Sequence, residues 1–326
     1  MLFRMLETFR LLDVMVPWFF PTFVFVVGAC VGSFLNVCIY RIPAGISVVT
    51  PRSRCACGNP IPWYDNLPIL SWILLRGKAR CCGRRFGIRY PVVEALTGIL
   101  FWAAWTAHPP VVAVAGMVLI GILIAASFID LDHMIIPDRF TIGGFLVGLC
   151  LASLIPSLHL SPYELLGWGV VDGFRSLLQA LQGAFLGSAI LLWIGLLAEA
   201  VLRREAMGFG DVKLMGAIGA FLGWEGAVFA IFGGAIAGCM LFAVGSLTRG
   251  VAGQTAATPA EPEVGASENQ QLNLAQQTEA MPPDDDAPRP GEIPFGPSLA
   301  IGAVVYFLWG HVWFDAYIML IRDLFQ

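Results

Sequence analysis

Charged residues are scarce in this chain of 326 residues: 13% are Asp, Glu, Lys or Arg, whereas 57% are hydrophobic. Because a soluble domain carries about a quarter charged residues, this composition excludes an ordinary soluble domain. It predicts one polytopic membrane protein in contact with the lipid bilayer, although the length alone would allow two soluble domains. We expect no nucleic-acid partner; the net charge of −4 itself says little, because the charge is segregated along the chain.

Three further patterns are missing from the sequence. The apolar stretch that follows residues 1–16 has no small-residue cleavage site, which argues against a secretory signal peptide. No Gly-x-Gly-x-x-Gly fingerprint occurs in a strand–helix setting, so no ordinary nucleotide-binding fold is indicated. No internal repeat is found, although such repeats are typical of secondary transporters.

Apolar runs of the length of a spanning helix, about 20 residues, recur along the chain. We therefore predict an all-α fold with about eight transmembrane helices. The predicted spans are 17–40, 92–107, 111–129, 140–157, 183–202, 213–224, 226–247 and 296–320. A break is expected at Trp224-Glu225-Gly226, between the sixth and seventh spans.

The spans divide the chain into three predicted regions. Residues 1–40 hold the first span with its N-terminal segment, 41–91 form a basic loop domain with four cysteines, and 92–326 form the main transmembrane domain. Within the last region, residues 250–292 are rich in Ala, Pro, Gln and acidic residues. Because this insert has too few apolar residues to offset the entropy of folding, we expect it to be disordered.

The lysines and arginines predict the orientation, because cytoplasmic loops carry an excess of both. With 41–91 placed in the cytoplasm, all of the 19 basic residues lie on the cytoplasmic side except Arg4, Arg10, Arg175 and Arg322. The same placement puts Asp130 and Asp211 together at the cytoplasmic edge of the membrane.

Asp130 and Asp211 belong to two short acidic motifs, Phe128–Asp138 and Gly208–Leu214, each at the edge of an apolar run. A carboxylate at a membrane boundary is costly unless it is paired, solvated or functional. Two carboxylates on different spans are the minimum for hydrolysis by an aspartyl dyad, in which one is ionised and the other protonated. We predict Asp130 and Asp211 as this dyad.

Two other acids in the first motif are secondary candidates. Asp132 lies about 200° around a helix from Asp130 and so faces elsewhere. Asp138 follows Pro137 and precedes an apolar run, which suits the N-cap of the next helix. The alternative for the whole motif is a solvated turn.

Glycines flank the second aspartate. Gly208 and Gly210 allow a positive φ or a close approach to another backbone, which leaves room for an extended substrate beside Asp211. The alternative is a capped helix start, in which Asp211 only satisfies free N–H groups. Beyond it, Gly216, Gly219, Ala220 and Gly223 predict a small-residue face that packs against a neighbouring helix.

The acidic motifs occur in order with three others. These are Gly32–Pro43, Trp63–Trp72 with Arg89–Glu94, and Ile293–Ala300. Together the motifs resemble the bacterial type IV prepilin peptidases, a Gly-x-Gly-Asp class of intramembrane aspartyl proteases. The resemblance covers most of residues 28–310, and it identifies 92–326 as the peptidase domain.

The resemblance implies that Asp130 and Asp211 are catalytic. It further implies cleavage of the basic leader of type IV prepilins, or of type II secretion pseudopilins, at the cytoplasmic face of the bacterial inner membrane by a multi-pass protein. An acidic site edge suits a basic leader. Many such proteins also methylate the new N-terminus with S-adenosylmethionine, and this cofactor is expected from the resemblance alone.

The four cysteines of the loop depart from the family pattern of two Cys-x-x-Cys pairs. The first pair is shortened to Cys55-Ala56-Cys57, and Cys81 stands beside Cys82 after Ala79. Four thiolates are enough for a tetrahedral zinc site, but adjacent cysteines strain the backbone if both turn to one metal. The sequence agrees both with a zinc site and with four free thiols.

Two other functional classes compete with a protease. A transporter could use the paired acids as a proton relay, but its acids would lie near mid-membrane on broken helices. A scaffold of the pilus or secretion machinery would use the same acids only to cap helices. The position of both acids at one membrane edge favours the protease.

Overall fold

The fold is built from helices, as predicted. The computed structural model describes residues 15–50, 52–55, 57–161, 163–167, 169–203, 207–252, 294–310 and 312. In this part of the chain the β-structure is limited to two isolated bridges, Arg54 with Pro60 and Lys78 with Arg85. The all-α prediction is therefore confirmed.

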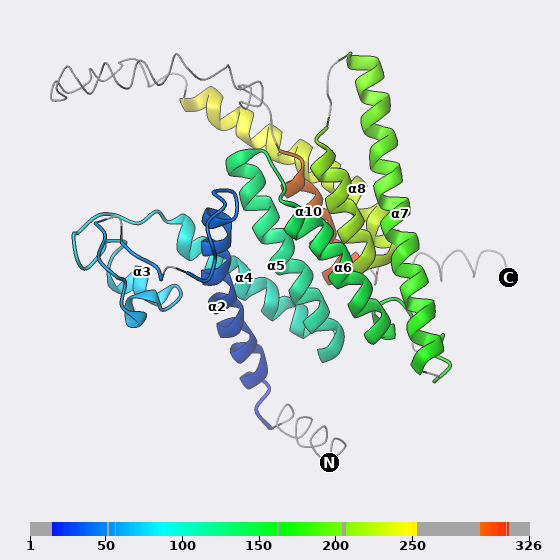
Figure 1. Ribbon diagram of the computed structural model, residues 1–326, viewed down its shortest axis with the longest axis horizontal. Helices are drawn as coiled ribbons and strands as arrows, with labels where there is room; N and C mark the ends of the chain where they lie inside the picture. The colour runs from blue at the N-terminus through cyan, green and yellow to red at the C-terminus, as the bar shows by residue number, and fades with distance from the viewer. Residues whose placement is uncertain are drawn as a thin grey trace. The chain divides into compact units, whose positions relative to one another are not determined.

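Each predicted span coincides with helix over its described residues (Figure 1), and residues 311 and 313–320 of the last span lie outside the described part of the chain. The longer helices are α2 (Phe19–Arg41), α4 (Arg89–Ala107), α5 (Pro110–His133), α6 (Asp138–Leu154), α7 (Gly169–Leu202), α8 (Phe209–Ala252) and α10 (Gly296–Val305), which continues as a π-turn over Tyr306–Gly310. The short elements are η1 (Trp63–Asn66), α3 (Leu70–Leu74) and η2 (Pro156–Leu158).

Within the described residues, four helical segments are long and apolar enough by themselves to cross a membrane: Phe19–Arg41, Pro110–His133, Gly169–Leu202 and Phe209–Ala243. These make the chain a membrane protein with several spanning helices. The sixth and seventh predicted spans are joined in α8, and the break expected at Trp224 falls at Gly223. Gly223 has φ 71° and ψ −174°, a conformation open to glycine because it has no Cβ.

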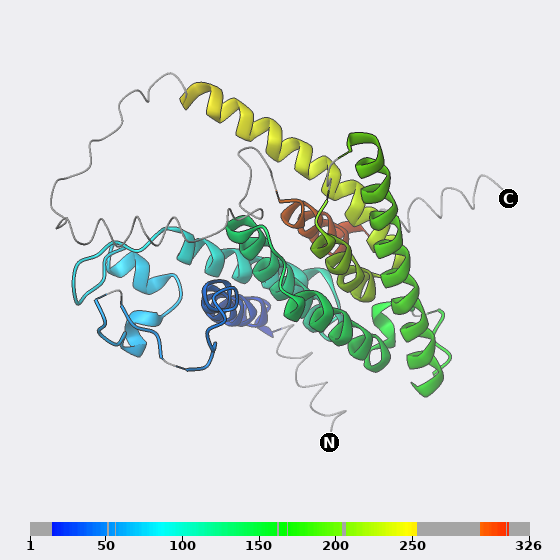
Figure 2. The same ribbon diagram turned by 45° about the horizontal axis from the view of Figure 1, so that its top comes forward.

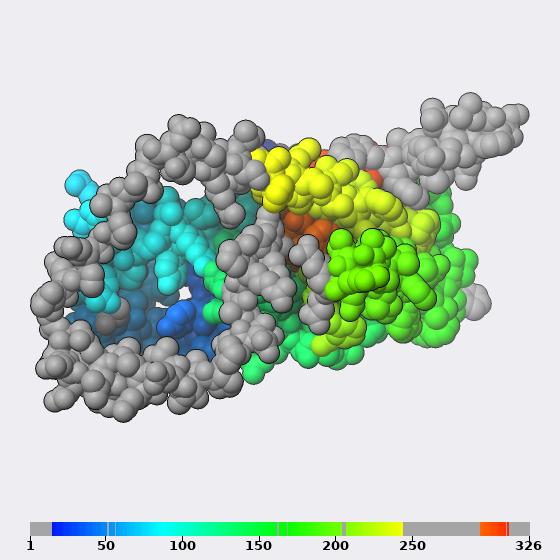
Figure 3. Space-filling view, turned by 90° about the horizontal axis from the view of Figure 1, so that it is seen from above, coloured from blue at the N-terminus to red at the C-terminus, as the bar shows by residue number. Residues whose placement is uncertain are grey.

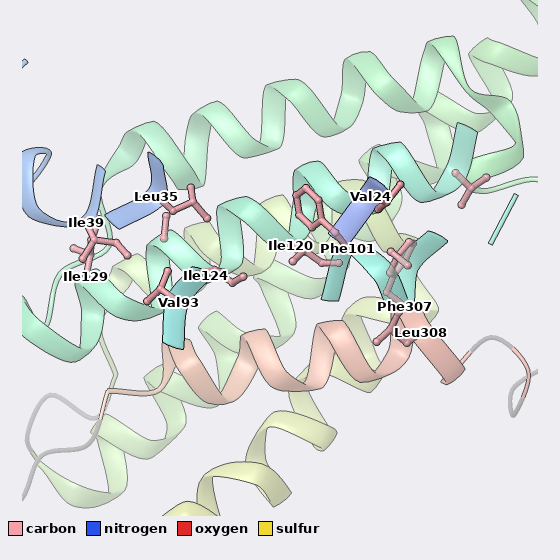
Figure 4. Packing of buried hydrophobic residues seen from close by; sticks show 13 residues of the cluster. Val24, Leu35, Ile39, Val93, Phe101, Ile120, Ile124, Ile129, Phe307 and Leu308 are labelled. Atoms are coloured by element: carbon pink, nitrogen blue, oxygen red, sulfur yellow. The ribbon is translucent and has the colours of Figure 1, made fainter. Parts of the chain in front are cut away.

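The first hydrophobic core lies where α2, α4, α5 and the end of α10 meet. Helix α2 packs on α4, which packs on α5, and α5 also contacts α10. Figure 4 shows Leu35, Val93, Ile124 and Ile129 pointing toward one another from the first three of these helices, with Phe307 at the end of α10. These buried side chains hold α4 and α5 side by side, and both helices carry residues of the sites described below.

The predicted small-residue face of α8 is confirmed. A Cβ on Gly219 would collide with the carbonyl of Gly183 in α7, and a Cβ on Gly148 in α6 would lie 2.9 Å from Ala220 Cβ. Such contacts bring helix backbones close together, which favours association where lipid gives no hydrophobic driving force. Figure 2 shows α8 beside α7 and α10.

The chain divides into two compact units. One comprises residues 1–238 with 294–326 and contains both sites described below; the other is Cys239–Ile293. Most of the predicted disordered insert, residues 253–292, lies outside the described residues.

Candidate active site and cysteine cluster

Asp130 sits at the C-terminal end of α5, one turn before the helix ends. Asp130 is only 5% exposed, and its Oδ2 accepts a hydrogen bond of 3.2 Å from the backbone N–H of Gly296. Gly296 is the first residue of α10, so this bond joins segments 166 positions apart in sequence. A helix N-terminus presents free N–H groups, which suits an acidic partner.

Asp211 lies in the first turn of α8 and is 7% exposed. Among the described residues no donor contacts its Oδ1, although this oxygen is buried. The carboxyl group of Asp211 lies close enough to that of Asp130 for the two to interact electrostatically. The structure therefore brings together the two acids that the sequence predicted as a pair.

Ile136, in the segment between α5 and α6, lies between Gly210 and Gly296. A Cβ on Gly210 would be 3.3 Å from Ile136 Cβ, and a Cβ on Gly296 would be 3.2 Å from Ile136 Cδ1. Neither Ile136 nor Gly296 was predicted as a site residue. Both stand in motifs noted in the sequence, but a contact across 166 positions gives no periodic signal.

The two predicted site-shaping glycines differ in their surroundings. Neither Gly208 nor Gly210 has a positive φ, so that part of the expectation is wrong. Gly210 does allow a close approach, to Ile136. A Cβ on Gly208 would lie 3.9 Å from Asp211 Oδ2, an ordinary contact, so Gly208 borders the carboxylate without crowding it. The backbone N–H of Asp211 donates to the carbonyl of Gly208 at 3.1 Å.

Asp132 is engaged in an ion pair away from Asp130. Its Oδ1 lies 2.7 Å from Arg89 Nη1, and Arg89 also donates to the carbonyl of Phe128. The Arg89 guanidinium stands over the Phe128 ring, 5.1 Å from its centroid. Asp132 thus links the end of α5 to the start of α4. Its side chain points away from that of Asp130, in agreement with the prediction.

Asp138 was expected to be the N-cap of α6, and this expectation is wrong. Asp138 is the first helical residue, and Pro137 occupies the cap position. The rigid φ of Pro137 prepares the helix start, which displaces the aspartate by one residue. Asp138 Oδ1 lies 2.7 Å from Lys213 Nζ, and this ammonium also stands over the ring of Phe209. The pair links the starts of α6 and α8 beside the dyad.

The four loop cysteines gather into one cluster. Cys55, Cys57, Cys81 and Cys82 hold their Sγ atoms within 4.8 Å of one another. The shorter distances are 3.5 Å from Cys55 to Cys82 and 3.3 Å from Cys57 to Cys81. Tetrahedral zinc with Zn–S bonds of about 2.3 Å places its sulfurs about 3.8 Å apart, so the donor set fits a zinc ion.

Two tight turns overcome the strain expected from the altered spacing. Gly58 (φ 88°) follows the first cysteine pair, and Gly83 (φ 69°) follows the second. The first turn is closed by the N–H of Gly58 donating to Cys55 O, and the second by the N–H of Gly83 donating to Ala79 O, both at 2.8 Å. Glycine adopts this left-handed backbone without the cost of a Cβ, so adjacent cysteines can face one centre.

The thiols in the cluster differ in acidity. The backbone N–H of Cys57 donates to Cys55 and lowers the pKa of the Cys55 thiol to about 7. The pKa of Cys81 is raised to about 12, first by its hydrogen bond with the Cys57 side chain. Because the thiolate is the form that binds metal, Cys55 is the first ligand available near neutral pH.

Two buried aspartates at the ends of apolar helices and a separate thiol cluster are the arrangement expected of a membrane protease with an accessory cysteine domain. The chain matches the Bacterial Peptidase A24 N-terminal domain over residues 26–108 and the Type IV leader peptidase family over residues 117–243. It belongs to the type IV leader peptidase family, which confirms the resemblance found in the sequence.

Curated relatives from three bacteria carry the name prepilin leader peptidase/N-methyltransferase. The relative from Myxococcus xanthus is 41% identical over 237 residues, which cover 69% of this chain and 64% of the relative. The relative from Aeromonas hydrophila is 35% identical over a stretch that covers 64% of this chain and 75% of the relative. The relative from Klebsiella pneumoniae is 34% identical over a stretch that covers 64% of this chain and 88% of the relative. No solved structure matches the chain.

The geometry predicts that Gly296→Ala inactivates the peptidase while the protein still folds. A Cβ at this position would lie 2.6 Å from Asp130 Oδ2, so the carboxyl group or the start of α10 must move. A misplacement of about 1 Å can cost on the order of 100-fold in rate, so we expect a loss of that size in leader cleavage.

The matched control is Gly143→Ala in α6, because a Cβ on Gly143 would meet nothing within 4 Å. Cleavage rates of both purified variants are compared with the wild type, together with their melting temperatures. A Gly296→Ala variant that cleaves at the wild-type rate would show that Asp130 does not depend on this close contact.

Proposed function

We propose that the chain hydrolyses the peptide bond after the basic leader of prepilins or pseudopilins, with Asp130 and Asp211 as the catalytic pair. The observation that carries this proposal is the convergence of two buried carboxyl groups from α5 and α8. The family and the relatives named above are leader peptidases, and this supports the reaction class.

The reaction follows from two carboxyl groups that share one proton. The ionised carboxylate accepts a proton from a water molecule, whose oxygen attacks the scissile carbonyl. The protonated partner donates a hydrogen bond to the carbonyl oxygen as negative charge develops there. The N–H of Gly296 occupies Oδ2 of Asp130, which fixes that carboxyl group and leaves its other oxygen for the reaction.

The neighbouring polar groups are already paired and so leave the chemistry to the dyad. Asp132 is bound to Arg89 and Asp138 to Lys213. Gly208 leaves that side of Asp211 open to an extended chain, the conformation in which a protease binds its substrate, whereas Gly210 is covered by Ile136. A transporter or scaffold is less well supported, because the family match is to peptidases.

We assign eight membrane spans, with the cysteine loop and the dyad on the cytoplasmic side of the bacterial inner membrane. The excess of Lys and Arg in residues 41–91 supports this orientation. In this assignment the two parts of α8 on either side of Gly223 are separate spans, and α4 and α6 cross the membrane beside α5. The substrate leader then approaches from the cytoplasm.

A second activity, methylation of the new N-terminus, is supported by the second half of the relatives' name. S-adenosylmethionine would supply the methyl group. Zinc bound by Cys55, Cys57, Cys81 and Cys82 would hold the loop domain together, because metal binding contributes directly to the folding of such small segments.

We predict that Asp130→Asn and Asp211→Asn each lower leader cleavage by about a thousandfold or more, because an amide can neither take up a proton from water nor share one. Asp132→Asn is the matched control, and it should cost less than about tenfold, because it removes only a half-exposed ion pair. The measurement is cleavage of a purified prepilin by variants with equal membrane insertion. Substantial processing by either dyad variant would refute the pair, and an inactive Asp132→Asn would show that the wrong acid was assigned.

We predict about one zinc per chain in the purified protein, measured by elemental mass spectrometry. Replacing all four loop cysteines by Ser should remove the metal and impair methylation more than cleavage, since the dyad lies outside the loop. Cys150→Ser in α6 should leave the metal content unchanged. A metal-free protein with both activities would exclude a required zinc site, and normal methylation by the fourfold variant would separate the loop from methyl transfer.

A further inference from the structure

A cavity of about 680 Å³ lies between the cysteine loop domain and the helices α2 and α4. Its helical wall includes Ser33 and Asn36 from α2 with Tyr90 and Glu94 from α4, and Trp72 of α3 lines it from the loop. In Figure 3 the blue and cyan residues of this region lie together, with gaps between them. Its size and largely apolar lining are those of a small-molecule site.

Close contacts between the two helices hold the helical wall in place. A Cβ on Gly32 would lie 2.7 Å from the backbone of Glu94, so α2 and α4 meet almost backbone to backbone. One turn later, Asn36 Nδ2 donates to the carbonyl of Tyr90 at 3.1 Å. The motif that begins at Gly32 thus has a physical purpose, because it places Ser33 and Asn36 in the cavity wall.

Glu94 is the carboxyl group that this wall presents to the cavity. It is 9% exposed, and its Oε2 accepts the N–H of Ile69 at 2.7 Å. Ile69 has φ 61°, a left-handed conformation that is unusual for a β-branched side chain. Strained backbone of this kind persists only where the surroundings hold it, and it clusters at ligand sites.

The other carboxyl group in the cavity lining, Asp65, is already neutralised. Arg80 binds it through two nitrogens, with a shortest distance of 2.8 Å, and this pairing lowers the pKa of Asp65. Within the described residues, the Glu94 carboxylate accepts hydrogen bonds from the Ile69 N–H and the Ser33 side chain and forms no ion pair. The basic residues of the lining are Arg41, Arg54, Lys78, Arg80 and Arg84, and in the described part of the chain none of them forms an ion pair with Glu94. Glu94 is therefore free to pair with a cationic group of a ligand.

Trp72 forms a rigid aromatic surface in the same cavity. Its Nε1 donates to the carbonyl of Phe86 at 3.4 Å, and its ring packs so closely on Gly77 that a Cβ there would lie 3.2 Å away. Gly77 also has φ 67°. A planar ring fixed from behind in this way can stack with a nucleobase, an interaction worth about 1–3 kcal/mol per base in other proteins.

We propose that this cavity binds S-adenosylmethionine, with the adenine stacked on Trp72 and the cationic sulfonium and ammonium end at Glu94. The proposal rests on the methyl-transfer activity proposed above and assigns its site. A fixed aromatic ring, the unpaired Glu94 carboxylate and the basic side chains of the lining match the base, the cationic groups and the α-carboxylate of that molecule, and the volume suits its size.

The transfer itself needs no further reactant. The lone pair of the neutral N-terminal amine forms the new N–C bond, the S–C bond breaks, and its electron pair stays on sulfur as a neutral thioether. The methylated amine then loses one proton to solvent. Since the product S-adenosylhomocysteine has lost the sulfonium charge, a carboxylate beside the sulfur favours the substrate over the product.

The test measures binding of S-adenosylmethionine and of S-adenosylhomocysteine to the purified full-length protein by calorimetry. Glu94→Gln keeps an oxygen for the Ile69 N–H and removes the charge. We expect it to weaken S-adenosylmethionine binding by about tenfold or more and S-adenosylhomocysteine binding less. Trp72→Ala should weaken both by about tenfold, whereas Trp72→Phe should retain most of the affinity.

The matched control is Trp63→Ala, because Trp63 is 79% exposed and does not line the cavity. Leader cleavage and melting temperature are measured for every variant and should stay near wild type. Wild-type binding by Glu94→Gln and Trp72→Ala, in a protein that methylates, would overturn this site and leave the proposed function intact. Equal loss of both ligands in Glu94→Gln would overturn its charge role. A wild type that neither binds nor methylates would refute both proposals.

Discussion

The meeting of three chain segments at the end of α5 is the constraint on which the site depends. Asp130 is buried and must be held near a second buried carboxyl group, and its Oδ2 is bound by the N–H of Gly296 at the start of α10. No Cβ fits at Gly296, and none fits easily at Gly210 on the other side of Ile136. Residues without side chains thus allow three helix ends to converge on two buried carboxyl groups, and buried carboxylates without a partner are costly.

Helix α4 connects this site with the loop domain. Its first residue, Arg89, pairs with Asp132 and Phe128 at the end of α5, while Tyr90 and Glu94, within the next two turns, line the cavity under the cysteine loop. The same short stretch of α4 therefore contacts the end of α5 that carries Asp130 and lines the proposed methyl-donor site. An N-terminus released by cleavage would have a short path to the second reaction.

Much of this arrangement was predictable because the membrane limits the alternatives. Apolar runs predict the helices, and the distribution of Lys and Arg puts Asp130 and Asp211 at one edge, so their pairing follows from sequence. The roles of Gly296 and Ile136 did not follow, because a contact between distant segments leaves no periodic pattern. The cap at Asp138 was misplaced by one residue, since Pro137 starts the helix itself. The cysteine cluster forms despite its unusual spacing because Gly58 and Gly83 turn the backbone.

The central claim, that two carboxyl groups share one proton during hydrolysis, is tested most directly by the pH dependence of kcat/KM for prepilin cleavage. Two interacting carboxyl groups predict a bell-shaped profile with two ionisations that belong to the pair. The account predicts this bell for the wild type and for the loop variant that lacks all four cysteines. A profile with a single ionisation, or one that is flat between about pH 4 and pH 9, would contradict the shared-proton dyad.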